Sequence, residues 1–210
     1  MRKLIESTLV SLDGVIGAPE RWSAFDAEAT AYSIEQLGHY DAFVMGQVTY
    51  EMLYANWGHT ARNPYLDLIN AMPKYVASRS LTQTAWNATL LGPDPSSAIA
   101  RLKDQPGKDL IKYGTSRFDD ALVRDHLIDE FRFWIMPVVA GSGRRLFEHV
   151  DTSGLHLRLT DERRLENGSV ILTYVPRPPG ESNSSRSPSP QRGGTGLKAP
   201  YVTWPVRIPG

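Results

Sequence analysis

Short apolar segments that alternate with helix-favouring segments recur through residues 1–176, and this alternation restricts the fold more than any other feature. Residues 3–11, 41–45, 74–77 and 109–113 are rich in β-branched and other apolar side chains, which favour strands. Helix-favouring residues follow most of these segments. Strands that alternate with helices form a mostly parallel sheet with helices on both of its faces. We therefore predict the α/β class.

The remaining predicted elements complete this order. The predicted helices cover residues 26–37, 49–54, 96–104 and 118–125, and the later strands cover residues 130–139, 156–166 and 169–175. Asn167-Gly168 separates the last two strands, and this dipeptide is the strongest short signal for a hairpin. The sheet is therefore expected to end in an antiparallel hairpin at its C-terminal edge.

The last 34 residues, 177–210, differ in composition from the rest of the chain. Half of them are Pro, Gly or Ser, and they carry a net charge of +4 against −4 for residues 1–176. A segment of this composition buries too little apolar surface to offset the entropy of ordering it. We predict a folded domain over residues 1–176 and a disordered basic tail over 177–210. The favoured interpretation of the tail is a solvated extension, and the alternative is contact with RNA or phosphorylation at its RSPSPQR segment.

Composition excludes several classes of function. The chain has no cysteine, which rules out disulfides and thiolate metal sites, and its five histidines lack the spacing of metal ligands. No apolar run approaches the length of a membrane span, and Glu6 and Asp13 interrupt any signal-peptide core. The acidic folded part lacks a basic stripe for nucleic acid. We expect a cytoplasmic protein with no metal, membrane or nucleic-acid partner.

Three predicted strands end in small residues that are followed by hydroxyl or amide side chains. These strand ends carry Gly46-Gln47-Val48-Thr49, Ser78-Arg79-Ser80 and Tyr113-Gly114-Thr115-Ser116. In an open α/β sheet, ligands bind beyond the carboxyl ends of the strands, where glycines and helix N-termini accommodate phosphates. The pattern indicates a phosphorylated nucleotide. The alternative is that the glycines serve tight turns and that Thr49 caps a helix.

The order of five motifs resembles that of the dihydrofolate-reductase-like superfamily. The motifs are SLDGVIG, MGQVTYE, SRS, KYGTSRF and MPVVAGSGRRLF, and the similarity runs from Lys3 to Val175. The most similar branch is the reductase domain of the bifunctional riboflavin-biosynthesis deaminase/reductase, with its stand-alone bacterial relatives. The resemblance implies a three-layer fold with a sheet of about eight strands, an NADPH-dependent reductase activity and a homodimer.

The resemblance also assigns residues to the cofactor. The nicotinamide would adjoin Leu9, Ile16 and Gly17, and the pyrophosphate would adjoin Gly46, Gln47, Val48 and Thr49. The ribose and its 2′-phosphate would lie against Ser78, Arg79 and Ser80. A second phosphate turn would be formed by Tyr113, Gly114, Thr115, Ser116 and Arg117, and the rim of the cleft by Gly141 and Gly143. The family usually has Arg at the position of Gln47. The preference for NADPH over NADH is therefore expected to be weaker than usual, so that NADH is a possible cofactor.

The candidate residues of the substrate site are chosen because they lie near the family's first long helix or on its long strand. Asp26 is the candidate catalytic carboxylate, and the candidate substrate contacts are Trp22, Phe25, Trp134 and Met136. Two alternatives stay open: Asp26 caps the helix, since Asp is a good N-cap residue, and Trp134 and Met136 belong to the core.

The hypothesis is a reductase that transfers a hydride from NADPH to a small heterocycle, of the pterin, folate or ribosylaminopyrimidine type. The alternative is a nucleotide-binding or regulatory protein that has the same fold and no turnover. Gln47 and the uncertain general acid support this alternative. Binding of NADPH without its oxidation would favour it.

Overall fold

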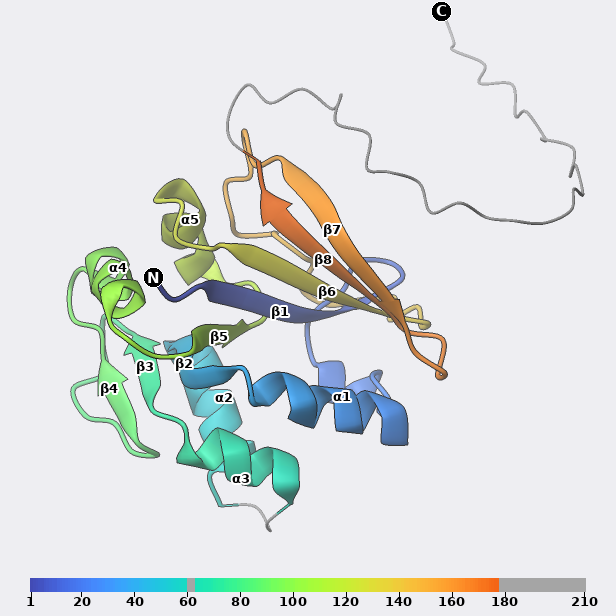
Figure 1. The fold of residues 1–210 in the computed structure, drawn as a ribbon, viewed down its shortest axis with the longest axis horizontal. Coiled ribbons are helices and arrows are strands. Elements are labelled where there is room, and N and C mark those ends of the chain that lie inside the picture. Colours follow the sequence, from blue (N-terminus) through green and yellow to red (C-terminus); the bar gives the residue numbers. More distant parts are fainter. Residues whose placement is uncertain (60–62, 178–210) are drawn as a thin grey trace, which may run out of the picture. The chain divides into compact units, whose positions relative to one another are not determined.

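The computed structural model describes residues 1–59 and 63–177, which form a mixed eight-stranded sheet with helices on both faces (Figure 1). The strands lie in the order β4-β3-β2-β5-β1-β6-β8-β7. Their bounds are Leu4–Ser11 (β1), Tyr40–Gly46 (β2), Lys74–Ala77 (β3), Ala88–Leu90 (β4), Asp109–Tyr113 (β5), Glu130–Met136 (β6), Leu157–Arg164 (β7) and Val170–Pro176 (β8). The pairs from β4 to β6 are parallel, and β8 pairs antiparallel with β6 and β7. The predicted fold class is confirmed.

The helices largely follow the prediction. Their bounds are Pro19–Arg21 (η1, a 3₁₀ turn), Ala27–Leu37 (α1), Gln47–Trp57 (α2), Pro64–Ala71 (α3), Pro95–Asp104 (α4) and Arg117–Arg124 (α5). The sequence prediction missed α3 and β4, because a helix of eight residues and an edge strand of three leave little periodic pattern. The predicted strand 130–139 was too long. It ends at Met136, because Pro137 has no N–H for the ladder.

The side chains of β1 point alternately to the two faces of the sheet, and each face carries its own apolar layer. Leu4 and Val10 pack with α4 and α5 residues such as Ile99 and Leu122. Ile5 points to the opposite face, which α1, α2 and α3 cover (Figure 1). Polar side chains on a central strand such as β1 therefore lie between the sheet and a helix and need partners there.

Residues 178–210 lie outside the described residues, so the predicted tail and its boundary at residue 176 remain predictions. No helix within residues 1–59 and 63–177 is long and apolar enough to cross a membrane.

Candidate active site

The carboxyl ends of β2, β3 and β5 bring the three predicted strand ends together. Gly46 is paired with Ala77, the residue before Ser78, in the β2–β3 ladder. A Cβ added at Gly46 would lie 3.7 Å from Ser116 Oγ, so the β2–α2 turn (residues 46–49) adjoins the β5–α5 turn (residues 114–117). The structure thus brings three separate segments together at one edge of the sheet.

Gln47 connects the β2–α2 turn to the β3 turn (residues 78–80). Its Oε1 accepts hydrogen bonds from the hydroxyls of Ser78 at 2.7 Å and Ser80 at 2.8 Å. Its Nε2 donates to Glu51 Oε1 at 2.9 Å. Arg79, between the two serines, is exposed. Gln47, where the family usually has Arg, therefore positions the hydroxyls of Ser78 and Ser80. These hydroxyls flank Arg79, the only cation among residues 78–80.

The first turn of α2 is not capped by a side chain. Side chains cap α1, α3, α4 and α5, whereas Gly46 at the N-cap of α2 has none to offer. The first N–H groups of a helix lack partners within the helix, and together with the helix dipole they favour an anion. The N-terminus of α2 is therefore suited to a phosphate.

A second group of contacts joins the loop after β1 to the loop after β6. The Asp13 carboxylate accepts hydrogen bonds from Ser11 Oγ at 2.7 Å and from the N–H groups of Ala140 and Gly141, both at 2.9 Å. Gly143 has φ +133°, and a Cβ there would lie 2.8 Å from Val15 Cγ1, so this close approach requires glycine. The two loops form one unit beside the strand ends.

Protonation of Asp13 should release this unit. Hydrogen bonds from Ser11 and then from Ala140 lower the pKa of Asp13 from its usual value to about 2. Its stabilising contribution is therefore present above the unfolded pKa of about 4 and lost as the pH falls through about 2. We expect Asp13→Ala to speed amide exchange at Ala140 and Gly141 at neutral pH, measured by NMR. Unchanged exchange at both amides would contradict this role.

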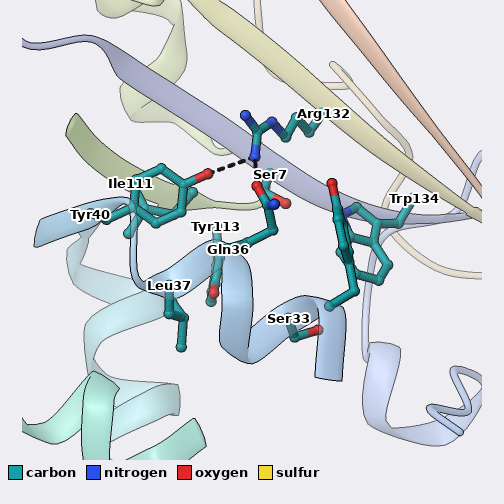
Figure 2. Close-up of a pocket in the computed structure, with 10 residues that line it drawn as sticks. Ser7, Ser33, Gln36, Leu37, Tyr40, Ile111, Tyr113, Arg132 and Trp134 are labelled. Carbon is teal, nitrogen blue, oxygen red and sulfur yellow. Dashed lines mark hydrogen bonds between the residues drawn. The ribbon is translucent and has the colours of Figure 1, made fainter. Parts of the chain in front are cut away.

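A cavity lies between α1 and the face of the sheet formed by β1, β5 and β6 (Figure 2). Its lining residues are Ser7, Tyr32, Ser33, Gln36, Leu37, Tyr40, Ile111, Tyr113, Arg132 and Trp134. Its volume of about 30 Å³ is enough for about two waters. A ring-shaped ligand would therefore require α1 to move away from the sheet.

Arg132 is the centre of polar contacts in this cavity. Its Nε donates to Glu130 Oε1 at 2.6 Å, and its Nη1 donates to the Tyr40 hydroxyl at 2.7 Å and to Gln36 Oε1 (Figure 2). Burial raises the pKa of Tyr40 to about 12, so its hydroxyl keeps its proton at neutral pH. Ser7, Gln36, Tyr40 and Arg132 all bring donor hydrogens, and none of the ten lining residues carries a carboxylate.

The predicted substrate residues are only partly brought to this cavity. Trp134 lines it, and Phe25 packs against Trp134 with ring centroids 5.6 Å apart. Trp22 instead donates from Nε1 to the carbonyl of Gly17 at 2.8 Å, and Met136 is buried beside Ser169. Neither lines the cavity.

Asp26 is placed at the N-terminus of α1 and does not line the cavity. Its Oδ1 accepts a hydrogen bond from the Ala29 N–H at 2.8 Å. The alternative prediction, that Asp26 caps the helix, is confirmed.

Most polar lining residues were missed from the sequence, although two periodic signals pointed to them. Ser33 and Gln36 lie three residues apart and therefore share a face of α1. Arg132 and Trp134 lie two residues apart on β6 and therefore share a face of the sheet. Only the packing of α1 against the sheet brings these two faces together around the cavity. Within residues 1–59 and 63–177, no group of three or more His, Asp or Glu side chains could hold a metal ion.

The chain is similar in sequence to proteins of one family. The sequence profile described as the RibD C-terminal domain matches residues 2–171. A relative from Bacillus subtilis, the uncharacterized protein YyaP, is 27% identical over 184 residues, covering 82% of this chain and 94% of that protein.

Two solved structures share the fold at 14% identity, a level that bears on the fold alone. One is the diaminohydroxyphosphoribosylaminopyrimidine deaminase/5-amino-6-(5-phosphoribosylamino)uracil reductase of Thermotoga maritima, with a TM-score of 0.61 over 84% of this chain and 57% of that one. The other is the dihydrofolate reductase of Enterococcus faecalis, complexed with NADP(H), with a TM-score of 0.55 over 84% of this chain and 97% of that one.

Proposed function

Because this chain belongs to the RibD C-terminal domain family, we propose that it is an NADPH-dependent reductase that transfers a hydride to a small pyrimidine-type heterocycle. The observation that carries the proposal is the uncapped N-terminus of α2 beside the β5–α5 turn. Tyr113, which directly precedes this turn, also lines the cavity. The Thermotoga relative of this fold is named a 5-amino-6-(5-phosphoribosylamino)uracil reductase, and the Enterococcus relative was solved with NADP(H).

The donor set of the strand ends fits a dinucleotide phosphate cofactor. The N–H groups at the start of α2 would hold the pyrophosphate, and the exposed Arg79 the 2′-phosphate, with Ser78 and Ser80 on either side of it. The Ser116 hydroxyl donates to Asp119 and the Thr115 side chain is buried, so these two residues would shape the adjoining turn. Leu9, Ile16 and Gly17 would border the nicotinamide, with Gly141 and Gly143 at the rim. NADPH supplies the hydride when it is bound.

The cavity chemistry selects among the candidate substrates. A 2-aminopterin presents an edge of N–H donors, for which a carboxylate is the complementary partner. The lining residues of this cavity include no carboxylate. Gln36 Oε1 and the Tyr40 hydroxyl accept hydrogen bonds from Arg132, which leaves the Gln36 Nε2 group and the Tyr40 O–H as donors toward a ligand. A pyrimidinedione, with carbonyl acceptors, fits such donors better than a pterin. We therefore place the pyrimidine class ahead of pterins and folates.

Arg79 is the cation that we assign to the 2′-phosphate. A hydrogen bond to a charged group contributes about 1.5–3 kcal/mol, which is roughly ten- to hundredfold in Kd. We expect Arg79→Ala to raise the Kd for NADPH by this factor and to leave the Kd for NADH nearly unchanged, measured by tryptophan fluorescence. The exposed Arg101 on α4 provides the control variant, Arg101→Ala. Equal losses for both cofactors would refute this assignment.

The reductase activity is tested by the absorbance of NADPH in the presence of a substrate panel. The panel pairs aminopyrimidinediones with 2-aminopterins and dihydrofolate. Oxidation of NADPH with a pyrimidinedione, and none with the pterins, is the expected result. Binding of NADPH without oxidation by any member would instead support the nucleotide-binding protein without turnover.

A further inference from the structure

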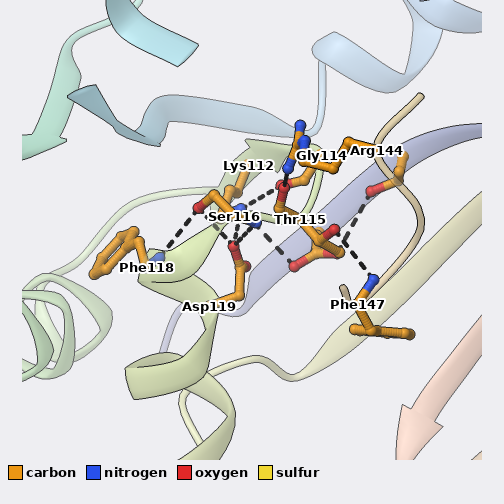
Figure 3. Close-up of polar contacts among 10 residues, drawn as sticks. Lys112, Gly114, Thr115, Ser116, Phe118, Asp119, Arg144 and Phe147 are labelled. Atoms are coloured by element: carbon orange, nitrogen blue, oxygen red, sulfur yellow. Dashed lines mark hydrogen bonds and ion pairs between the residues drawn. The ribbon is translucent and has the colours of Figure 1, made fainter. Parts of the chain in front are cut away.

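Three ionisable side chains meet beneath the β5–α5 turn, on the face of the sheet that α5 covers (Figure 3). Glu6 on β1 is paired with Lys112 on β5 in the parallel ladder, and Asp119 comes from α5. Glu6 and Asp119 are 0% exposed, and Lys112 is 1% exposed. Two carboxyl groups therefore share one ammonium group out of contact with water.

The contacts identify Asp119 as the ionised carboxylate. Its Oδ2 lies 2.8 Å from Lys112 Nζ and accepts hydrogen bonds from the Ser116 N–H at 2.6 Å and the Ser116 hydroxyl at 2.8 Å. Burial opposes the charge, but the positive charge of Lys112 and the hydrogen bonds from Lys112 and Ser116 together lower the pKa of Asp119.

Glu6 lacks comparable support for a charge. Its Oε2 lies 3.9 Å from Lys112 Nζ, and its Oε1 accepts only a long hydrogen bond, 3.4 Å, from the Thr8 hydroxyl. The β6 residue paired with it is the apolar Phe131. Burial, followed by the negative charge of Asp119, raises the pKa of Glu6 well above its usual value.

Two oxygens of this cluster have no hydrogen-bond partner among the described residues, Glu6 Oε2 and Asp119 Oδ1. A proton on Glu6 that is shared with Asp119 would satisfy both, because a protonated carboxyl is a donor and a carboxylate is an acceptor. We propose that Glu6 is a positioning residue whose shared proton keeps the β5–α5 turn in its phosphate-binding conformation.

The turn depends directly on the charges in this cluster. Lys112 Nζ donates to the carbonyl of Gly114, and Asp119 holds both the N–H and the hydroxyl of Ser116. Gly114 itself has φ +67°. Loss of the proton would make Glu6 a second carboxylate that competes for Lys112 and would add a negative charge beneath the site. Both effects weaken the binding of a phosphate.

The expected consequence is an affinity for NADPH that depends on pH, and this consequence rests on the proposed cofactor site. NADPH is titrated against the full chain between pH 6 and about pH 10, followed by tryptophan fluorescence. Bound phosphates favour the protonated form of Glu6, so binding of NADPH should raise the pKa of Glu6. A rise of about one pKa unit corresponds to an affinity for NADPH that falls about tenfold as the pH increases and Glu6 ionises. Glu6→Gln, which stays neutral, should remove this part of the pH dependence. The exposed Glu162 provides the control variant, Glu162→Gln, which should behave as the wild type.

A second measurement needs no cofactor. Infrared difference spectroscopy between wild type and Glu6→Gln should show the carbonyl stretch of a protonated carboxylic acid at neutral pH. Absence of this band overturns the shared proton, and an identical pH dependence of NADPH affinity in Glu6→Gln overturns the positioning role. If NADPH fails to bind at any pH, the proposed cofactor role fails, while the infrared band still decides whether the proton is present.

Discussion

Replacement of Arg132 by Met is expected to reduce kcat/KM for a pyrimidinedione by about a hundredfold or more while the Kd for NADPH stays unchanged. Arg132 brings the only positive charge among the lining residues of the cavity, and its contacts orient Gln36 and Tyr40. Each hydrogen bond to a charged group contributes about 1.5–3 kcal/mol. The loss of one such bond to the substrate, together with the lost orientation of Gln36 and Tyr40, accounts for a reduction in kcat/KM of about a hundredfold or more. The measurement is steady-state NADPH oxidation together with a separate NADPH titration.

Two further variants separate this effect from a loss of folding. Arg132→Met leaves the buried carboxylate of Glu130 without its ion pair, whereas Arg132→Lys keeps the charge but not the planar fork. Arg132→Lys should therefore keep the melting temperature and lose most of the activity. The exposed Arg158 on β7 provides the control, Arg158→Met. Full activity in Arg132→Lys and Arg132→Met would exclude this cavity as the substrate site.

Asp119→Ala is expected to lower the free energy of unfolding by about 3–5 kcal/mol, because removing one partner of a buried ion pair leaves the other uncompensated. The substitution removes the nearer of the two carboxylates around Lys112 Nζ and the acceptor of two Ser116 hydrogen bonds. Urea unfolding at neutral pH measures the loss, with the exposed Asp161→Ala as the matched control. A change within about 0.5 kcal/mol, the size expected of a surface substitution, would contradict the cluster.

A double substitution tests whether Glu6 can replace Asp119. With Asp119→Asn, the only remaining counter-charge for Lys112 within the cluster is Glu6, so Glu6 should ionise and recover part of the stability. Adding Glu6→Gln removes that recovery, and the double variant should lose more stability than the sum of the two single variants. Additive losses would show that the two carboxyls act independently.

The sheet and most of its helices could be predicted, because each depends on a local pattern. Residues 109–113 (DLIKY) are a short strand-like segment that ends at Gly114, and Asn167-Gly168 marks the hairpin between β7 and β8. Short elements such as α3 and β4 carry too few residues for a pattern, and they form through packing against β3 and its neighbours.

The cofactor edge could be predicted in outline and the buried clusters could not. Glycine and hydroxyl residues after a strand indicate a phosphate turn, whereas the contact of Gln47 with Ser78 and Ser80 depends on the pairing of β2 with β3. Glu6 lies far from Lys112 and Asp119 in the sequence, and only the strand register and the position of α5 bring the three side chains together. Burial of charged residues is also uncommon, so each would be expected on the surface.

The central claim is that the edge formed by the β2–α2, β3 and β5–α5 turns binds NADPH. Titration of the full chain with NADPH tests it most directly, since Trp22, Trp57, Trp86 and Trp134 within the described residues report binding by quenching and by energy transfer to the nicotinamide. We expect saturable quenching in the micromolar range with NADPH, weaker binding of NADH, and weaker binding of NADPH in Arg79→Ala. No quenching or energy transfer with either cofactor up to millimolar concentrations would contradict it.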